Sequence, residues 1–275
     1  MERLGIIAGS GELPLLVADE ASSKGHEVFA LGFPGFTDPG LDARVNELVW
    51  LKLGQIQKAI SAFQSRGITR VVMVGKIEKA GLMRLWSIRP DRRALKLVLG
   101  LEDWRDDTIL AAIAGELLKV GIVVDEITLW AGKLMAPAGV LTHKAPNRRQ
   151  WKDIEFGRAM ALGIGSLDIG QTVVVRNAAV VVVEAIEGTD RAIRRAGDMD
   201  IHDTVVVKMA KPGQDMRFDV PGVGPSTIDS MIAAEARVLA IEAGRTLITN
   251  SEEMLRKANG AKISVVGIPA TGPVN

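Results

Sequence analysis

The chain has 275 residues, of which 47% are apolar and 24% charged, and its formal net charge is +1. This is the composition of a globular protein long enough for two domains, and so balanced a charge predicts no general attraction to nucleic acid. The absence of cysteine excludes disulfides, thiolate catalysis and cysteine-ligated zinc.

The N-terminus enters a predicted strand at Leu4 without the long apolar stretch of a signal peptide. Further along the chain there is no run of about 18 uncharged apolar residues, so we predict no membrane span. The expected compartment is the cytoplasm.

The first half of the chain alternates short apolar runs with amphipathic stretches. Because such alternation is typical of parallel βαβ units, residues 1–131 are predicted to form a Rossmann-like domain with a parallel sheet, and the fold class is α/β. Strands are expected at Leu4–Ala8, Val28–Leu31, Val45–Leu51, Val71–Val74 and Ile122–Ile127, and helices at Leu13–Ser23, Gln55–Arg66 and Thr108–Val120.

Periodicity is lost over Ala131–Gly139, and residues 132–139 are interpreted as a linker. Residues 140–275 are predicted to form a second α/β domain, whose sheet is mixed because two strands flank Arg176-Asn177 as a hairpin. Its strands are expected at Thr172–Val175, Val180–Ile186, Thr204–Lys208, Val238–Glu242, Thr246–Ile248 and Ile263–Val266, and its helices at Gln150–Leu162, Asp190–Ala196, Ser226–Ala236 and Glu252–Ala258.

Two glycine turns follow strands of the first domain. Gly9-Ser10-Gly11 precedes Pro14, which suits the first turn of a helix, so the turn either presents its amides to an anion or is purely structural. Pro14 occupies the place of the third small residue of an NAD fingerprint, and Leu31-Gly32-Phe33 supplies no acid, so NAD is disfavoured. At Gly75-Lys76 the glycine admits a phosphate and the lysine supplies charge, with a solvated lysine as the alternative.

A basic and apolar segment follows between residues 84 and 99. Its five cations stand against one acid and alternate with Trp86, Ile88 and aliphatic residues. This pattern fits anionic headgroups and acyl chains, and a solvated cationic face over an ordinary packing stripe explains it equally well. Asp106-Asp107 is interpreted first as a helix start and second as a pair of metal ligands. The five cations are Arg84, Arg89, Arg92, Arg93 and Lys96.

Carboxylates, cations and glycines gather between Glu184 and Ile228, at the ends of predicted buried strands. An unpaired charge near a core costs several kcal/mol, so this mixture indicates a charged ligand, namely a phosphate together with a metal. Thr189 or Asp190 is expected to cap a helix on which Arg194 completes a grip on phosphate.

Asp219 precedes a rigid Pro/Gly turn and suits Mg²⁺, although a plain turn residue explains it equally. The three histidines, at positions 26, 143 and 202, are scattered, so a histidine-ligated metal site or a Ser-His-Asp triad has little support.

These segments resemble the UDP-2,3-diacylglucosamine pyrophosphatases of lipid A biosynthesis, of the type that is not a metallophosphoesterase. The resemblance covers nearly the whole chain. It implies an Mg²⁺-dependent hydrolase that converts UDP-2,3-diacylglucosamine to UMP and 2,3-diacylglucosamine 1-phosphate while attached peripherally to the inner-membrane surface. The matching segments are Gly5–Pro14, Gly75-Lys76, Asp106-Asp107, Leu167–Gln171, Glu184–Asp190 and Lys211–Pro221.

By its Phe-Asp-Val-Pro match, Asp219 corresponds to the family's catalytic aspartate, and we expect Asp219 and Glu187 to hold the metal. Two alternatives stay open: another nucleotide-sugar enzyme, such as a transferase or epimerase, and a UDP-lipid-binding protein without activity. The oligomeric state is also open, with a homodimer among the options. The residues expected to bind substrate are Gly9, Ser10, Gly11, Gly75, Lys76, Gln171, Thr189, Asp190, Arg194, Lys208, Lys211 and Gln214.

Overall fold

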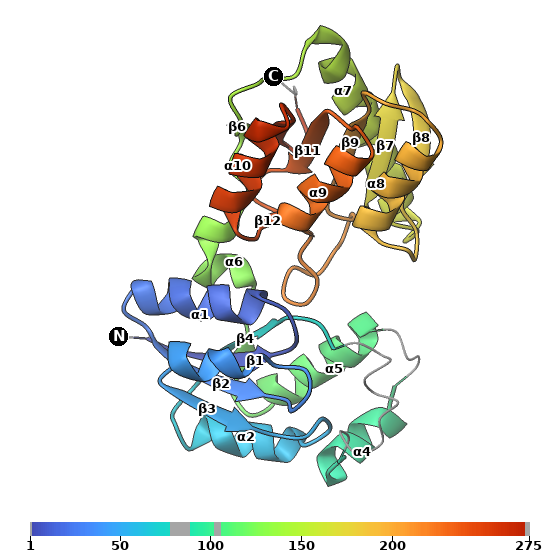
Figure 1. The fold of residues 1–275 in the computed structure, drawn as a ribbon. Helices are drawn as coiled ribbons and strands as arrows, with labels where there is room; N and C mark the ends of the chain where they lie inside the picture. Colours follow the sequence, from blue (N-terminus) through green and yellow to red (C-terminus); the bar gives the residue numbers. More distant parts are fainter. Residues whose placement is uncertain (1, 78–88, 102–105, 273–275) are drawn as a thin grey trace. The chain divides into compact units, whose positions relative to one another are not determined.

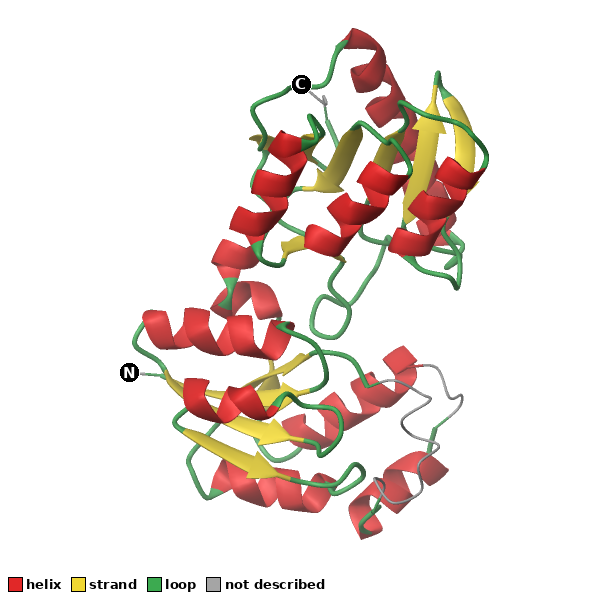
Figure 2. Cartoon of the chain, in the orientation of Figure 1, coloured by secondary structure: helices red, strands yellow, loops and turns green. Residues whose placement is uncertain are grey.

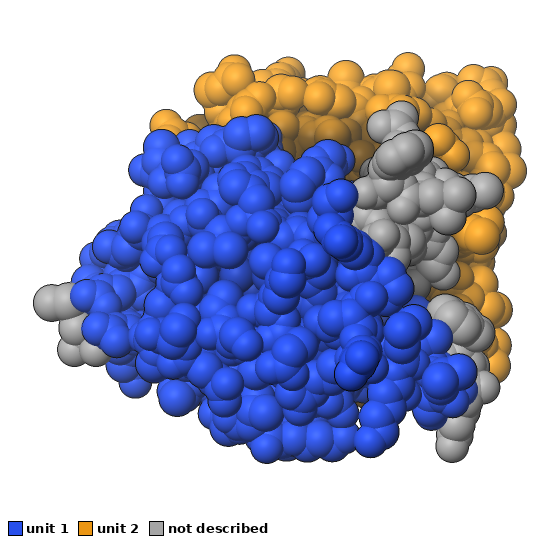
Figure 3. Space-filling view, turned by 90° about the horizontal axis from the view of Figure 1, so that it is seen from below, with its two compact units in different colours: residues 1–132, 215–218 blue, residues 133–214, 219–275 orange. Residues whose placement is uncertain are grey.

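The computed structural model describes residues 2–77, 89–101 and 106–272 (Figure 1). Two units are distinguished, one of residues 1–132 with 215–218 and the other of residues 133–214 with 219–275 (Figure 3). Arg84, Trp86 and Ile88 of the basic segment lie outside the described residues. Each unit is described here by itself.

The first unit is built on a five-stranded sheet of order β3-β2-β1-β4-β5. Every neighbouring pair is parallel, which confirms the predicted Rossmann-like sheet. The strands are β1 (Arg3–Ala8), β2 (Glu27–Gly32), β3 (Glu47–Trp50), β4 (Arg70–Val74) and β5 (Val123–Val124).

Helices flank this sheet (Figure 2), and apolar side chains join them to the strands. One core cluster joins Phe29 and Val71 of the strands to Phe63 of α2 and Leu117 of α5. The described helices of this unit are α1 (Leu13–Ser23), η1 (Pro39–Arg44), α2 (Ile56–Gln64), α4 (Arg92–Leu99), α5 (Asp106–Leu118) and α6 (Ile127–Trp130). The start of α5 at Asp106 agrees with the helix-start interpretation of Asp106-Asp107.

Three predicted strands end earlier than expected: β3 and, in the second unit, β8 (Ala179–Val183) each end before the predicted residue, and the strand predicted at Ile122–Ile127 is reduced to two residues. β5 ends at Val124, and Ile127 begins the short helix α6 instead of ending a strand. The reason is Asp125, a buried carboxylate that accepts hydrogen bonds from Arg70 Nε at 2.7 Å and Trp130 Nε1 at 2.9 Å. Holding both donors requires the chain to leave the sheet and turn.

The second unit has a six-stranded mixed sheet of order β6-β13-β11-β9-β7-β8. β9, β11 and β13 are parallel to one another, whereas β6, β7 and β8 are antiparallel to their neighbours, as the mixed-sheet prediction requires. The hairpin between β7 and β8 turns at Asn177 and Ala178, whose φ angles of 51° and 54° match the type I′ turn that suits hairpins. The strands are β6 (Gly139–Val140), β7 (Thr172–Arg176), β8 (Ala179–Val183), β9 (Val205–Lys208), β11 (Val238–Glu242) and β13 (Ser264–Ile268).

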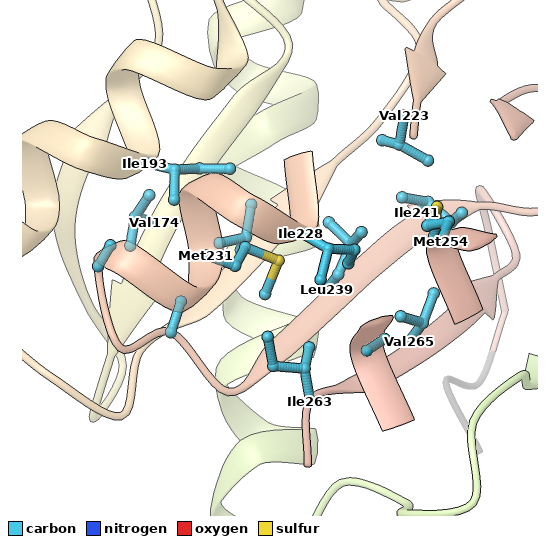
Figure 4. Close-up of a cluster of buried hydrophobic side chains, with 14 of the residues drawn as sticks. Val174, Ile193, Val223, Ile228, Met231, Leu239, Ile241, Met254, Ile263 and Val265 are labelled. Atoms are coloured by element: carbon cyan, nitrogen blue, oxygen red, sulfur yellow. The ribbon is translucent and has the colours of Figure 1, made fainter. Parts of the chain in front are cut away.

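Helices cover both faces of this sheet. α7 (Arg148–Ser166) packs on β7 and β9, while α8 (Thr189–Asp198), α9 (Pro225–Ala233) and α10 (Ser251–Gly260) lie on the opposite face (Figure 1). Under these three helices Ile193, Met231 and Met254 meet Leu239 and Val265 of the sheet (Figure 4).

Three short elements in the linker and in the Pro/Gly turn were not foreseen. The segment interpreted as linker contains η3 (Gly132–Leu134) and β6, whose Gly139 pairs with Gly267 of β13. The Pro/Gly turn after Asp219 contains β10 (Gly222–Val223), which pairs in parallel with β12 (Leu247–Ile248) outside the main sheet. Within the described part of the chain, no helix combines the length and the apolar character that crossing a bilayer requires.

Candidate functional site

The two glycine turns of the first unit meet where the sheet changes direction. From β1 the chain proceeds outward to β2 and β3, and it then returns to place β4 on the other side of β1. In open α/β sheets, ligands bind at the carboxyl ends of the strands beside such a switch point. Gly9-Ser10-Gly11 follows β1 and Gly75-Lys76 follows β4, so the topology brings both predicted turns to this place.

The turns are held together by backbone contacts. Ser10 and Lys76 form an isolated bridge, in which Ser10 N donates to Lys76 O at 2.7 Å and Lys76 N donates to Ser10 O at 3.1 Å. The Ser10 hydroxyl also donates to Lys76 O at 2.8 Å. A Cβ atom on Gly9 would lie 2.7 Å from Lys76 O, and one on Gly75 would lie 2.7 Å from Ser10 O. Both glycines are therefore required by close approach.

Gly11 differs from these two glycines. Its φ of +92° is in the region that favours glycine, yet a Cβ atom there would meet nothing within 4 Å. Helix α1 begins two residues later, with a proline in its first turn and without a capping hydrogen bond from the Glu12 side chain. An open glycine turn before a helix N-terminus suits the oxygens of an anion.

In the second unit, a cluster of polar side chains is buried where β9 ends and β7 begins. Lys208 and Glu184 are only 4% and 6% exposed. Thr189 lies between them: Lys208 Nζ donates to Thr189 Oγ1 at 2.9 Å, and this hydroxyl donates to Glu184 Oε1 at 3.0 Å. Thr172 Oγ1 is 3.3 Å from the same hydroxyl. The amide oxygen of Gln171 and Glu184 Oε2 are buried and have no hydrogen-bond partner among the described residues.

The start of α8 corrects the predicted cap. The N-cap residue is Gly188, with φ of 85°, while Thr189 is the first helical residue and turns its hydroxyl into the buried cluster. Asp190 lies in the first turn, and Arg194 is exposed one turn later. Because no side chain caps it, the partial positive charge of this helix N-terminus is available to an external anion.

Glu187, expected to bind metal, is already paired. Its carboxylate accepts hydrogen bonds from Arg195 Nη2 and, at 3.1 Å, from the amide of Ala185. A hydrogen bond from its own backbone amide, followed by the Arg195 guanidinium, lowers the pKa of the Glu187 carboxyl. Binding a metal would require this ion pair to open.

The loop after β9 carries three predicted residues in one hydrogen-bonded chain. Lys211 N donates to Gln214 Oε1 at 2.8 Å, and Gln214 Nε2 donates to Asp219 Oδ2 at 2.6 Å. Lys211 Nζ in turn contacts Asp168 Oδ1 at 2.6 Å. The exposed Asp219 is thus aligned through its Oδ2 atom.

Between these residues, Asp215 and Arg217 form an ion pair with an Nη2–Oδ2 distance of 2.6 Å. The hydrogen bond from Arg217 is the main cause that lowers the pKa of the Asp215 carboxyl. The pair fixes the middle of the loop by a local contact.

The donor set fits Mg²⁺ in part. Among the described residues no three His, Asp or Glu side chains gather into a metal site. Mg²⁺ often takes only one or two carboxylates and completes its shell with water and substrate phosphate, so the exposed Asp219 carboxylate fits this chemistry. The paired Glu187 fits it less well.

Sequence reasoning missed several partners in this region. Thr172 and Glu242 stand at strand ends, and Glu242 is buried, accepting from the amide of Ala210 at 2.7 Å. Asp168 lies within the matching segment Leu167–Gln171, but nothing in its spacing indicates Lys211 as its partner. The sequence signal for Glu242 was an acidic residue at the end of an apolar strand, a position that indicates a buried carboxylate.

Comparisons with known proteins agree along the whole chain. Residues 3–134 match the model of the LpxI N-terminal domain, and residues 137–266 match that of the LpxI C-terminal domain. A curated relative, the UDP-2,3-diacylglucosamine pyrophosphatase LpxI of Caulobacter vibrioides, is 30% identical over 279 residues, covering 98% of both chains.

Solved structures give only distant matches. A glycinamide-RNase-transformylase T from Mycobacterium tuberculosis is 15% identical over 67% of this chain and 44% of its own, with a TM-score of 0.25. A UDP-glucose-4-epimerase from Stenotrophomonas maltophila is 10% identical over 95% of this chain and 98% of its own, with a TM-score of 0.32. Scores this low establish no shared fold.

Proposed function

The chain belongs to the LpxI family, and we propose that it hydrolyses the pyrophosphate bond of UDP-2,3-diacylglucosamine in lipid A biosynthesis, releasing UMP and 2,3-diacylglucosamine 1-phosphate. The observation that carries this proposal is the match to a UDP-2,3-diacylglucosamine pyrophosphatase over 98% of both chains. The chemistry of the two strand ends supports it, because each offers groups that suit phosphate oxygens.

In the first unit, we propose that the Gly11 amide and the ammonium group of Lys76, which follow adjacent strands, bind phosphate oxygens of the substrate. The amides of Gly9 and Ser10 already donate to Val74 O and Lys76 O, each at 2.7 Å, and serve the contact between the two turns. The close approach at Gly9 and Gly75 holds the two turns against each other, which keeps Gly11 and Lys76 at adjacent strand ends.

In the second unit, side chains would do the work. We propose that the N-terminus of α8 and Arg194 bind phosphate oxygens, while Gln171, Asp190, Lys211 and Gln214 complete the binding site. Thr189 and the buried Lys208, also expected to bind substrate, are proposed instead to hold these groups in place. Asp219, aligned through Gln214, would orient the attacking water or bind the metal. Phosphoryl transfer needs positioning and charge neutralisation more than covalent chemistry, and these side chains are of the kinds that supply both.

We further propose that the reaction requires Mg²⁺. Bound Mg²⁺ supplies positive charge to the pyrophosphate oxygens. Asp219 is the proposed ligand, and Glu187 becomes a second one only if it leaves Arg195.

The test is direct. Purified protein is incubated with UDP-2,3-diacylglucosamine, with Mg²⁺ or with EDTA, and the nucleotide product is identified. Release of UMP that EDTA abolishes is the expected result. Release of UDP, or a changed sugar with an intact pyrophosphate, would identify another nucleotide-sugar enzyme. Tight binding without turnover would identify a UDP-lipid-binding protein.

Peripheral attachment to the inner-membrane surface is proposed to involve α4. Its outward face, which we call the α4 face, combines the exposed cations Arg92 and Lys96 with Leu95 and Leu99, which are 50% and 87% exposed. Leucines in water between cations are typical of a helix that lies at an anionic bilayer surface.

One of the cations predicted to meet the membrane is already bound within its own unit. Arg93 Nε donates to Glu116 Oε2 at 2.7 Å and its Nη1 donates to Gln57, so Arg93 fixes α4 to its own unit. Arg89, just before the helix, is exposed and joins the α4 face.

A further inference from the structure

We propose that Glu184, Thr189 and Lys208 form a buried bridge that fastens the N-terminus of α8 to the loop carrying Asp219, and that Glu184 and Lys208 act as positioning residues. All the groups of this bridge belong to the second unit. The catalytic consequence rests on the proposed function, whereas the mechanical link between helix and loop can be tested without it.

The bridge is continuous in hydrogen bonds. Glu184 follows β8 and accepts from Thr189, the first residue of α8, at 3.0 Å. Thr189 accepts from Lys208, the last residue of β9, at 2.9 Å. Lys208 Nζ also donates to the carbonyl of Gly222 at 2.8 Å, three residues after Asp219. One ammonium group therefore holds both the helix and the loop.

Burial makes this connection rigid. The two charged residues are more than nine-tenths buried, so their charges compensate each other through a single hydroxyl group in a poorly polarisable environment. The backbone beside Glu184 is closely packed, since a Cβ atom on Gly170 would lie 2.1 Å from Glu184 O. The backbone of Glu184 therefore lies close to that of Gly170.

An apolar trio would serve stability at least as well. Replacing a buried ion pair by packed hydrophobic residues is often neutral or stabilising, so a buried Lys and Glu are weak evidence for stability alone. Glu184 Oε2 is moreover buried with no hydrogen-bond partner among the described residues, an arrangement that natural proteins rarely keep without a functional reason. Its place between a helix N-terminus and the Asp219 loop supplies that reason.

The end of α8 needs such a fastening. Its N-cap, Gly188, has no side chain that could fix the first turn. The Thr189 hydroxyl forms its hydrogen bonds within the bridge and does not cap the helix amides. An anion bound by this helix end keeps its distance from Asp219 only if helix and loop are tied. Misplacement by about 1 Å can reduce turnover by about a hundredfold in enzymes.

The deciding experiment is hydrogen exchange of the full-length protein without any ligand. Thr189→Val keeps the shape of the side chain and removes the hydroxyl that joins the two charges. We expect amide exchange to rise about tenfold or more in both residues 188–192 and residues 219–223, which are separate in sequence. Thr189→Ser restores the hydroxyl and should recover most of the protection in both segments.

Two further variants complete the design. Asp229→Asn breaks an exposed ion pair with Lys257, 2.8 Å long, in the same unit and should leave both segments unchanged. Thr189→Ala replaces the valine variant if that protein does not fold. Faster exchange confined to residues 188–192, or a serine variant as unprotected as the valine variant, would overturn the bridge.

Turnover is then measured on the same proteins. If wild type releases UMP, kcat of the Thr189→Val protein should fall about tenfold or more, while kcat of the serine variant stays close to that of wild type. If wild type shows no turnover, the proposed function has failed, and the exchange result still decides whether the bridge exists.

Discussion

Replacing Gly75 by alanine should disrupt the joint between the two glycine turns of the first unit. Gly75 has a φ of +87°, and a Cβ atom there would lie 2.7 Å from Ser10 O and 2.8 Å from the carbonyl carbon of Gly9. Both neighbours are backbone atoms at the ends of paired strands, so neither can move aside cheaply. Gly11→Ala is the matched control, because Gly11 has a similar φ of +92° but open space around it.

The expected magnitude follows from two contributions. A non-glycine residue held in this backbone region costs about 1–3 kcal/mol, and both variants bear this cost. Overpacking against atoms that cannot retreat adds about 1–3 kcal/mol in Gly75→Ala alone. The effect of alanine on the unfolded chain is the same in both variants and cancels. We therefore expect Gly75→Ala to be less stable than Gly11→Ala by about 1–3 kcal/mol.

Urea unfolding followed by tryptophan fluorescence suits this comparison. Four of the five tryptophans lie within residues 1–132, so the signal reports mainly on the first unit. With a slope of about 1–3 kcal/mol per molar urea, the midpoint of Gly75→Ala should lie about 1 M below that of Gly11→Ala. Equal midpoints would show that the two turns do not touch. The proposal that Gly9–Gly11 and Gly75-Lys76 form one binding site would then be wrong.

Three further predictions concern the loop around Asp219 and the membrane. Asp219→Ala should lower kcat more than tenfold, a loss above roughly 1.4 kcal/mol of transition-state stabilisation, while substrate binding persists; a smaller loss removes Asp219 from catalysis. Because the pKa of Asp215 is lowered in the folded chain, its ion pair stabilises the protein above the unfolded pKa of about 3.9 and the stabilisation is lost as pH falls through the folded pKa. The stability difference between wild type and Arg217→Met, measured by urea unfolding, should therefore shrink from pH 5 to pH 2; a constant difference would contradict the pairing. Replacing the three cations of the α4 face by serine should release the protein from anionic vesicles in low-salt co-sedimentation, whereas replacing three control lysines by serine should not. If both triple variants bind the vesicles equally, the α4 face is not the membrane-binding surface. The α4-face cations are Arg89, Arg92 and Lys96, and the exposed controls are Lys58, Lys144 and Lys152.

The sheets were predictable because their signals are local. Apolar runs such as Val71–Val74, separated by amphipathic stretches, identify strands and crossovers whatever the rest of the chain does. The hairpin at Asn177 was equally local. The failures occurred where a long-range contact decides the outcome: Ile127 entered a helix because Asp125 binds Arg70, 55 residues away.

The candidate site shows the same division. The positions of Gly9 and Gly75 at strand ends follow from the sequence, but their contact depends on β1 and β4 being neighbours, which the order of elements alone does not fix. The role of Thr189 was predicted as a cap because threonine at a helix start usually caps. Its hydroxyl turns inward instead, because Lys208 and Glu184, both buried, need a shared partner.

The two units thus carry the proposed phosphate-binding groups, of different kinds, at the carboxyl ends of their strands. In the first unit the proposed groups are the Gly11 amide and Lys76, on two turns whose contact tolerates no side chain at Gly9 or Gly75. In the second they are side chains and a helix end, whose placement depends on buried hydrogen bonds around Lys208. Substitutions at Gly9 or Gly75 should therefore act chiefly through folding, and those at the exposed Asp219 chiefly through turnover. Stability and kcat measured on one set of variants separate the two contributions.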